Sequence, residues 1–115
     1  MVTLYGIPNC DTVKKARAFL AERGVAHGFH DYKKQGVPVE ALDRWIAELG
    51  WEALVNRRGT TWRQLDAARQ ARVVDAASAK ALMLEAPSLI RRPVVESGTE
   101  LHVGFDAAEW SRRWG

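Results

Sequence analysis

The spacing of apolar residues changes along the chain, and these changes predict where strands and helices lie. Residues 2–5 are β-branched or aromatic and lead into the turn-forming residues 6–9, which predicts a strand followed by a turn. Apolar residues then recur at helical spacing up to Gly24, a typical helix terminator. Asp11 or Thr12 is expected to supply the N-cap or an acceptor in the first turn of that helix.

A second strand is predicted at residues 27–32, where the polar stretch 33–36 ends it. The chain therefore opens in the order strand, helix, strand. Such a unit favours a right-handed crossover and a parallel pair of strands.

The middle of the chain is predicted to be helical. A helix begins near Pro38 and continues to Gly50, and a short apolar turn follows it at residues 51–55. Residues 56–61 form a polar loop, and a short helix is expected at 62–65. Another helix begins near Asp75 and stops at Pro87.

The end of the chain returns to β-structure. Residues 93–95 and 101–103 read as strands around a glycine-containing hairpin loop at 96–99. A final amphipathic helix is predicted at about 106–114, with Asp106 as its N-cap. The fold expected is α/β and thioredoxin-like, with a mixed β-sheet. Residues 1–115 would form a single domain with a helical insertion at about 37–88.

Composition narrows the class of protein. One cysteine in 115 residues excludes an internal disulfide and argues against a small secreted scaffold. No signal-peptide pattern and no apolar run long enough to span a bilayer is visible, so we expect a cytoplasmic monomer without membrane contact. The net charge is +3, but the arginines are scattered among acidic residues, so nucleic-acid binding is not expected.

Cys10 is the main candidate for chemistry because it lies between the first turn and the first helix. Backbone N–H groups and the positive end of the helix dipole would stabilise its thiolate, which is the nucleophilic form. The alternative is a small buried cysteine with no reactivity. Position 13 is Val13, so no second cysteine can resolve a mixed disulfide. An external thiol is therefore required, and glutathione is the obvious one.

Two arginine-containing segments could bind anions. Arg92 precedes Pro93 at the start of a predicted strand, where the proline is a candidate cis residue and the guanidinium could hold a thiolate or an oxyanion. The alternative is a solvated surface pair. The donor-rich loop from Asn56 to Arg63 could bind a carboxylate or phosphate-like anion, or could be polar surface.

The three histidines have no metal-ligand spacing with the cysteine, and no metal is expected.

Five segments of the chain resemble the YffB branch of the arsenate reductase (ArsC)/Spx family. They are residues 4–16 (LYGIPNCDTVKKA), 49–51 (LGW), 56–62 (NRRGTTW), 75–78 (DAAS) and 89–93 (LIRRP), and they extend over essentially the whole chain. The resemblance implies a thioredoxin-like domain with a helical insertion. It also implies that Cys10 is the catalytic cysteine, that Arg92 helps to bind the oxyanion and stabilise the thiolate, and that Pro93 is cis.

The chain departs from the family pattern at three positions. Two further arginines of the arsenate reductases align with Asn56 and a position near Val103, where this chain has no arginine. The Spx transcription regulators often carry a second cysteine where Val13 stands. The function expected is therefore a glutathione-dependent thiol reductase acting on a small or protein thiol substrate. Arsenate reduction, and a Spx-like regulator that binds RNA polymerase without catalysis, are the alternatives.

The expected site extends from the nucleophile to the residues that would hold substrate and glutathione. Cys10 and Arg92 are assigned to catalysis. The expected substrate- or glutathione-binding residues are Asn9, Thr12, Arg57, Arg58, Thr60 and Pro93.

Overall fold

The computed structural model describes residues 2–98 and 100–114, and the chain forms two compact units. The sheet unit consists of Met1–Gln35 and Arg92–Gly115, and the helical unit consists of Gly36–Arg91. Each unit is considered by itself. The single-domain organisation, with its insertion at about 37–88, stays a prediction.

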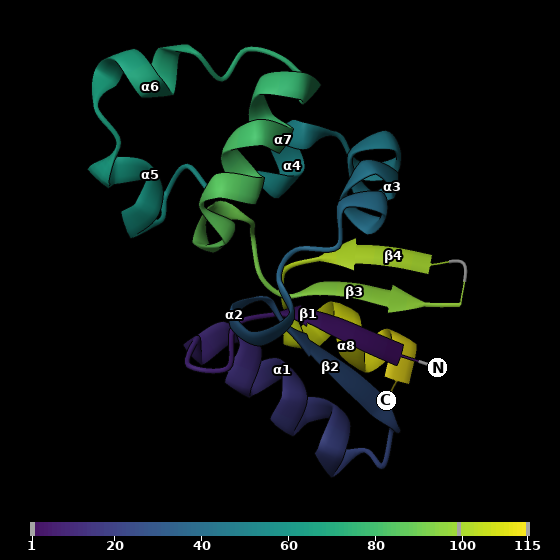
Figure 1. Cartoon of the computed structure of the whole chain (residues 1–115). Coiled ribbons are helices and arrows are strands. Elements are labelled where there is room, and N and C mark those ends of the chain that lie inside the picture. The colour runs from purple at the N-terminus through teal and green to yellow at the C-terminus, as the bar shows by residue number, and fades with distance from the viewer. Residues whose placement is uncertain (1, 99, 115) are drawn as a thin grey trace. The chain divides into compact units, whose positions relative to one another are not determined.

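A four-stranded mixed sheet is the framework of the sheet unit (Figure 1). Its strands are β1 (Val2–Gly6), β2 (His27–Asp31), β3 (Val94–Ser97) and β4 (Glu100–Val103), in the order β2-β1-β3-β4. β1 pairs with β2 in parallel and with β3 in antiparallel fashion, and β3 pairs antiparallel with β4. The predicted parallel pair is therefore confirmed.

The hairpin between β3 and β4 is tighter than predicted. Glu96 was expected in the loop, but it pairs with Thr3 on one side and Leu101 on the other, so both strands are longer. Gly98 makes the turn at φ +61°, and the remaining loop position, 99, lies outside the described residues. Pairing with β1 extends β3 beyond the point where the apolar residues end.

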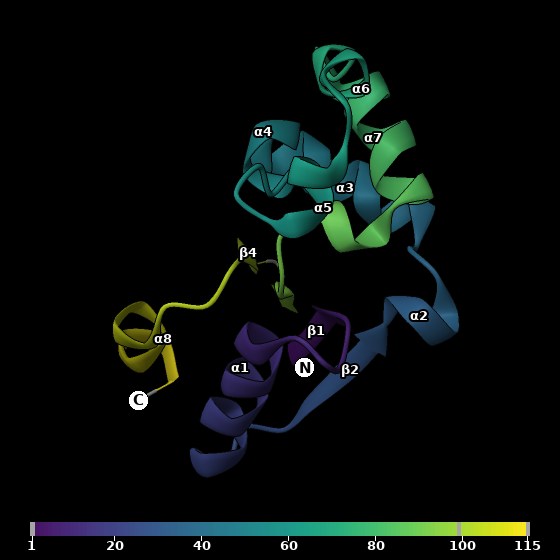
Figure 2. The same cartoon turned by 90° about the vertical axis from the view of Figure 1, so that its left-hand side faces the viewer.

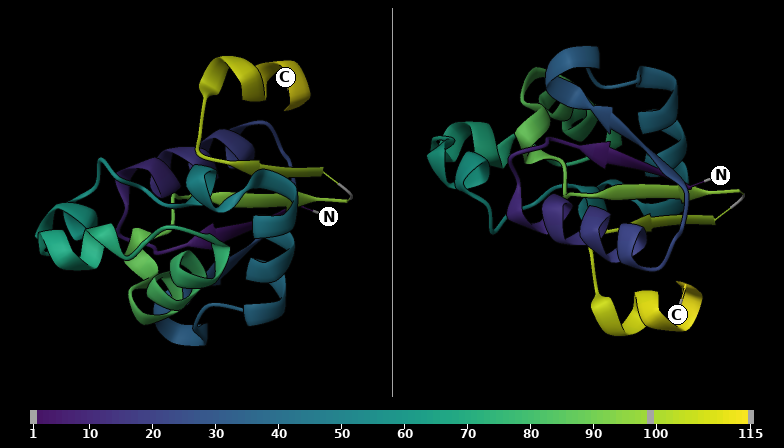
Figure 3. Two further views of the ribbon diagram at one scale, coloured as in Figure 1. Left: turned by 90° about the horizontal axis from the view of Figure 1, so that it is seen from above. Right: turned by 90° about the horizontal axis from the view of Figure 1, so that it is seen from below.

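Two helices cover one face of the sheet (Figure 2). Helix α1 (Asp11–Glu22) runs alongside the strands, and helix α8 (Ala107–Trp114) packs into the same core (Figure 3). That core contains Val2, Leu4, Ala16, Phe19, Leu20, Val95 and Trp110. The Asp106 carboxylate accepts hydrogen bonds from the N–H groups of residues 108 and 109, which confirms the predicted N-cap.

The segment after β2 differs from the prediction. β2 ends at Asp31, and the chain turns at once into a short helix, α2 (Tyr32–Gln35). The Asp31 carboxylate accepts a hydrogen bond from the Lys33 N–H at 2.8 Å, and the Gln35 side chain accepts one from the Asp31 N–H at 3.2 Å. These side-chain contacts favour a helical turn in the polar stretch that was expected to end the strand.

The helical unit contains five α-helices and a 3₁₀ turn within its described residues, 36–91. They are α3 (Val39–Leu49), α4 (Trp51–Leu54), α5 (Thr60–Gln64), α6 (Ala67–Ala71), α7 (Ala76–Glu85) and the 3₁₀ turn η1 (Pro87–Leu89). Trp45, Leu42, Leu54 and Met83 are fully buried. Among the described residues no helix is long and apolar enough to cross a membrane.

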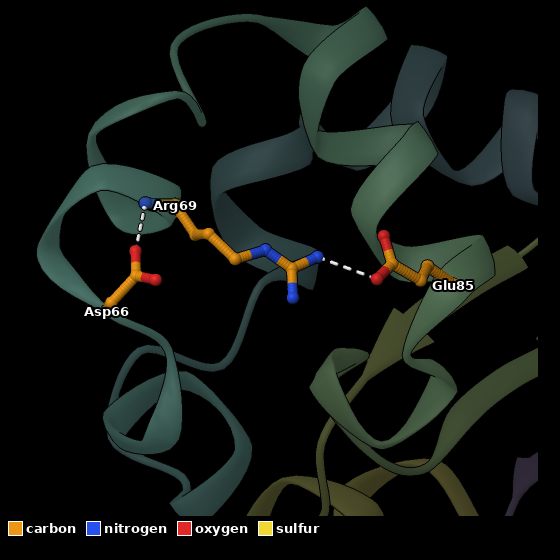
Figure 4. Close-up of polar contacts among 3 residues, drawn as sticks. All are labelled: Asp66, Arg69 and Glu85. Atoms are coloured by element: carbon orange, nitrogen blue, oxygen red, sulfur yellow. Dashed lines mark hydrogen bonds and ion pairs between the residues drawn. The ribbon is translucent and has the colours of Figure 1, made fainter.

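Two helix boundaries in this unit are determined by local polar contacts. Asp75 and Ser78 form a capping box at the start of α7, which confirms the predicted helix start. Helix α6 was not predicted. Asp66 caps it by accepting from the Arg69 N–H at 2.8 Å, and Arg69 forms an ion pair with Glu85 of α7 at 2.7 Å (Figure 4).

Candidate active site

Three chain segments meet at one edge of the sheet, which we call the Cys10 edge. It comprises the turn from Ile7 to Cys10 after β1, Tyr32 after β2, and Arg92–Pro93 before β3. The parallel pairing of Gly6 with Asp31 places the first two segments together, and the antiparallel pairing of Tyr5 with Val94 brings the third. Segments far apart in sequence therefore come together at this edge.

Cys10 is the N-cap residue of α1. Its backbone is extended (φ −96°, ψ 127°), and its carbonyl oxygen accepts the first helical hydrogen bond, from the Lys14 N–H at 2.9 Å. The N–H groups of the first turn have no partners within the helix and point toward the cap residue. Asp11 and Thr12 are the first two residues of the helix, so both lie in its first turn and neither is the N-cap.

The surroundings of Cys10 favour its thiolate. Partial burial raises the pKa of the thiol, but the N–H of Val13, the hydrogen bond and charge of Arg92, and the N–H of Thr12 together outweigh this effect. The net result is a pKa below the ordinary value. The neutral thiol makes no regular capping hydrogen bond, so these N–H groups act chiefly on the ionised sulfur.

Arg92 approaches the sulfur because β1 ends in a glycine. A Cβ atom on Gly6 would lie 3.0 Å from Cγ2 of Val13 and 3.7 Å from both Cβ and Cδ of Arg92. The missing side chain therefore lets α1 and Arg92 pack closely against the end of β1. The Arg92–Pro93 peptide bond is cis, as predicted, and Pro93 is fully buried.

Sequence reasoning missed Tyr32 as a member of this edge. It was assigned to the end of a strand, whereas it begins α2 with only 3% of its surface exposed. Its ring contacts His30 at 6.0 Å between centroids, and the His30 ring in turn lies 5.1 Å from that of Tyr5. An aromatic residue directly after the second parallel strand was the one available signal.

Asn9 lies beside the cysteine and is exposed. Its side-chain oxygen is 3.5 Å from the Lys33 ammonium, which links the turn after β1 to α2. Thr12 contributes through its backbone N–H. A substrate-binding role for Asn9, Thr12 or Pro93 stays a prediction.

Comparison with known proteins identifies the family of this chain. Residues 5–112 match the ArsC family. The chain belongs to the ArsC family. Its α/β fold, a mixed four-stranded sheet with helices, is the thioredoxin-like fold of its structural relatives.

Two solved structures are similar in both sequence and fold. A protein named YffB is 49% identical, with a TM-score of 0.92 and all of both chains covered. An arsenate reductase (ArsC) related protein from Brucella melitensis is 50% identical, with a TM-score of 0.78, over 96% of this chain and 92% of that one.

Among relatives compared by sequence, an uncharacterized Haemophilus influenzae protein is 40% identical over 96% of each chain. The global transcriptional regulator Spx of Streptococcus agalactiae serotype V is 30% identical over 95% of this chain and 80% of its own length. The family therefore includes relatives named as reductase-related proteins and relatives named as regulators.

The donor-rich loop of this ArsC-family chain lies in the helical unit. The Arg57 guanidinium is placed 5.6 Å from the Trp51 ring and 5.7 Å from the Trp62 ring, between two aromatic side chains. The Asn56 side chain accepts a hydrogen bond from the Arg58 N–H at 3.1 Å. Thr60 is the first residue of α5 rather than part of the loop. The expected role of these residues in binding glutathione stays a prediction.

Proposed function

We propose that the protein is a thiol-dependent reductase in which Cys10 is the nucleophile and glutathione the external reductant. The observation that supports this most directly is the position of the only cysteine. It caps a twelve-residue helix beside Arg92, and both features lower its pKa. Such a thiolate is a good nucleophile toward an oxidised sulfur atom.

The proposed cycle has two exchange steps. The Cys10 thiolate attacks the glutathione sulfur of a substrate mixed disulfide, a bond forms between the two sulfurs, and the substrate leaves as a thiolate. A glutathione thiolate then attacks the glutathione sulfur attached to Cys10. That step releases oxidised glutathione and regenerates the Cys10 thiolate. In sum, one glutathione thiolate is consumed, one substrate thiolate is released, and the disulfide bond passes from the substrate to oxidised glutathione.

Arg92 has the same role in both steps, which is to stabilise the Cys10 thiolate. Its positive charge and hydrogen bond stabilise Cys10 as a thiolate, both as the attacking group in the first step and as the leaving group in the second. A leaving thiol of lower pKa departs faster, so the lowered pKa of Cys10 accelerates the release of oxidised glutathione.

Incubation with oxidised glutathione tests the first half of this cycle. Intact-mass measurement should show one glutathione adduct per chain, which disappears when reduced glutathione is added. The Cys10→Ser variant should give no adduct. Arg92→Met should react more slowly near neutral pH than Arg91→Met, a matched variant of the exposed neighbour. Lack of an adduct on the wild-type protein would count against the proposal.

Arsenate reduction is the second candidate, and the Brucella relative's description as arsenate reductase related favours it. Of two further arginines of the arsenate reductases, one aligns with Asn56 and the other with a position near Val103, and neither position is an arginine in this chain. Glutathione-dependent arsenate turnover of the purified protein distinguishes the two candidates. We expect slow or absent turnover, because a single arginine beside the sulfur neutralises little of the charge on the oxyanion.

A further inference from the structure

The hydroxyl group of Tyr32 is buried without a hydrogen bond. The residue is 3% exposed, and its phenolic oxygen has no partner among the described residues. Most buried polar side-chain atoms in folded proteins are hydrogen-bonded, and leaving one unpaired destabilises the fold. An unpaired buried hydroxyl at the edge that carries the candidate nucleophile therefore needs an explanation.

A nearby tyrosine within the sheet has a partner for its hydroxyl. The Tyr5 hydroxyl donates a hydrogen bond to the Glu96 carboxylate at 2.5 Å across the strand pair. Tyr5 and Tyr32 are linked through the ring of His30, which lies against both. One phenol of this aromatic row is thus held by a protein acceptor, whereas the other is not.

Arg92 connects Tyr32 with Cys10. Its charge acts on the Tyr32 hydroxyl, and the same side chain hydrogen-bonds to the sulfur of Cys10. Burial, together with Tyr5 and Glu96, raises the pKa of Tyr32 against the opposing effect of Arg92, so the phenol keeps its proton. A protonated phenol and a guanidinium are both hydrogen-bond donors, and together they suit an acceptor that carries negative charge.

We propose that Tyr32 is a ligand-binding residue whose hydroxyl donates a hydrogen bond to an anionic oxygen of a ligand bound beside Arg92. That oxygen belongs either to a carboxylate of glutathione or to an oxyanion group of the oxidised substrate. The inference rests on the proposed function in that Cys10 is taken as the reacting group. The hydroxyl would find its partner only in the complex.

The Tyr32→Phe variant tests this because it removes the hydroxyl and nothing else. Sulfate and S-methylglutathione serve as unreactive probes, and their binding is measured as protection of Cys10 from alkylation by iodoacetamide. We expect the variant to bind at least one probe about 10-fold more weakly, the value of a hydrogen bond to a charged group. Without a probe, its alkylation rate should equal that of the wild type.

Thermal unfolding separates ligand binding from a structural role. Since the hydroxyl is unpaired in the folded protein, Tyr32→Phe should leave the midpoint temperature of unfolding unchanged or raise it by up to about 5 °C. Tyr5→Phe is the matched control, because it removes a hydroxyl that has a partner. It should lower the midpoint and leave probe binding unchanged.

The outcomes divide clearly. Weaker binding of S-methylglutathione alone identifies a carboxylate of glutathione as the acceptor, and weaker binding of sulfate alone identifies a substrate oxyanion. Unchanged binding of both probes overturns the proposal, as does failure of both to protect the wild type. An ordinary pKa for Cys10 in the wild type would instead overturn the proposed function and leave the binding result to stand by itself.

Discussion

At the scale of single residues, backbone N–H groups and one side chain together stabilise the Cys10 thiolate. The N–H groups of Val13 and Thr12 come with the helix, whereas Arg92 comes from a segment more than eighty residues away in sequence. Together they outweigh the opposing effect of burial on the pKa of Cys10. The contribution of Arg92 is the part that a substitution can remove without changing the helix.

Replacement of Arg92 by Met should therefore raise the pKa of Cys10. The variant keeps the apolar stem of the side chain and loses the charge and the hydrogen bond that favour the thiolate. The rate of alkylation by iodoacetamide, followed between about pH 5 and pH 10, gives the pKa. Arg91→Met, at the exposed neighbouring position, should leave the profile unchanged. Equal shifts in the two variants would show that Arg92 has no specific effect.

The same shift makes stability depend on pH. The pKa of Cys10 is lower in the folded protein than in the unfolded chain, so ionisation favours folding. This contribution is present above the unfolded value of about 8.5 and is lost as the pH falls through the folded value.

Urea unfolding of the wild type and Cys10→Ser across this range measures the effect. The difference in free energy of unfolding, wild type minus variant, should rise with pH up to the unfolded value and then level off. A difference that is flat, or that falls with pH, contradicts a lowered pKa.

At the scale of elements, the end of β1 packs closely against the first turn of α1. Gly6→Ala should destabilise the protein by about 1–3 kcal/mol, because the new methyl group meets Val13 at 3.0 Å. It should also raise the pKa of Cys10, since the Val13 N–H must move away from the sulfur. Denaturant unfolding and the alkylation profile measure the two effects.

A double variant provides the control for that substitution. Val13→Ala removes the side chain that Gly6→Ala meets, so the two changes together should destabilise less than the sum of each alone. Strict additivity would show that the two positions do not contact each other.

The cap of α8 offers a test that is independent of the cysteine. Asp106→Ala should lower the free energy of unfolding by about 1 kcal/mol, because the N–H groups of residues 108 and 109 lose their acceptor. Asp106→Asn keeps an acceptor oxygen and should retain most of the stability. Thermal or urea unfolding of the two variants measures the difference, and an equal loss in both would exclude capping as the cause.

Sequence patterns predicted the elements well where periodicity was long and the caps were local. The helix after Cys10, the helix that begins at Asp75 and the parallel pair of strands all follow from such signals. The short helices α2 and α6 were missed because side-chain contacts of Asp31 and Asp66 stabilise them. Four or five residues are also too few to show a helical periodicity of apolar positions. The extra length of β3 comes from pairing with β1, which is a tertiary effect.

In the candidate site, too, residues with a local sequence signal were predicted and residues that depend on tertiary contacts were not. Cys10 was predicted from its place before a helix, and Arg92–Pro93 from its place before a strand. Tyr32 could not be assigned, because a buried hydroxyl without a partner is a property of the folded structure alone. The position of Arg57 between two tryptophan rings was likewise beyond sequence reasoning, since the rings come from α4 and α5.

At the scale of the whole molecule, one cysteine in 115 residues limits the chemistry. Any disulfide that Cys10 forms joins it to another molecule, so turnover should require an added thiol. The family includes regulators as well as reductase-related proteins, and a regulator that acts without catalysis needs no such turnover. Glutathione-dependent turnover is therefore the property that separates the two classes.

The proposed function requires that the pKa of Cys10 be lowered in the folded protein, and the alkylation rate of Cys10 as a function of pH measures this directly. The account predicts that the rate of the wild-type protein reaches half of its maximum at a pH below the ordinary thiol value of about 8.5. A half-maximal rate at or above that value would contradict it.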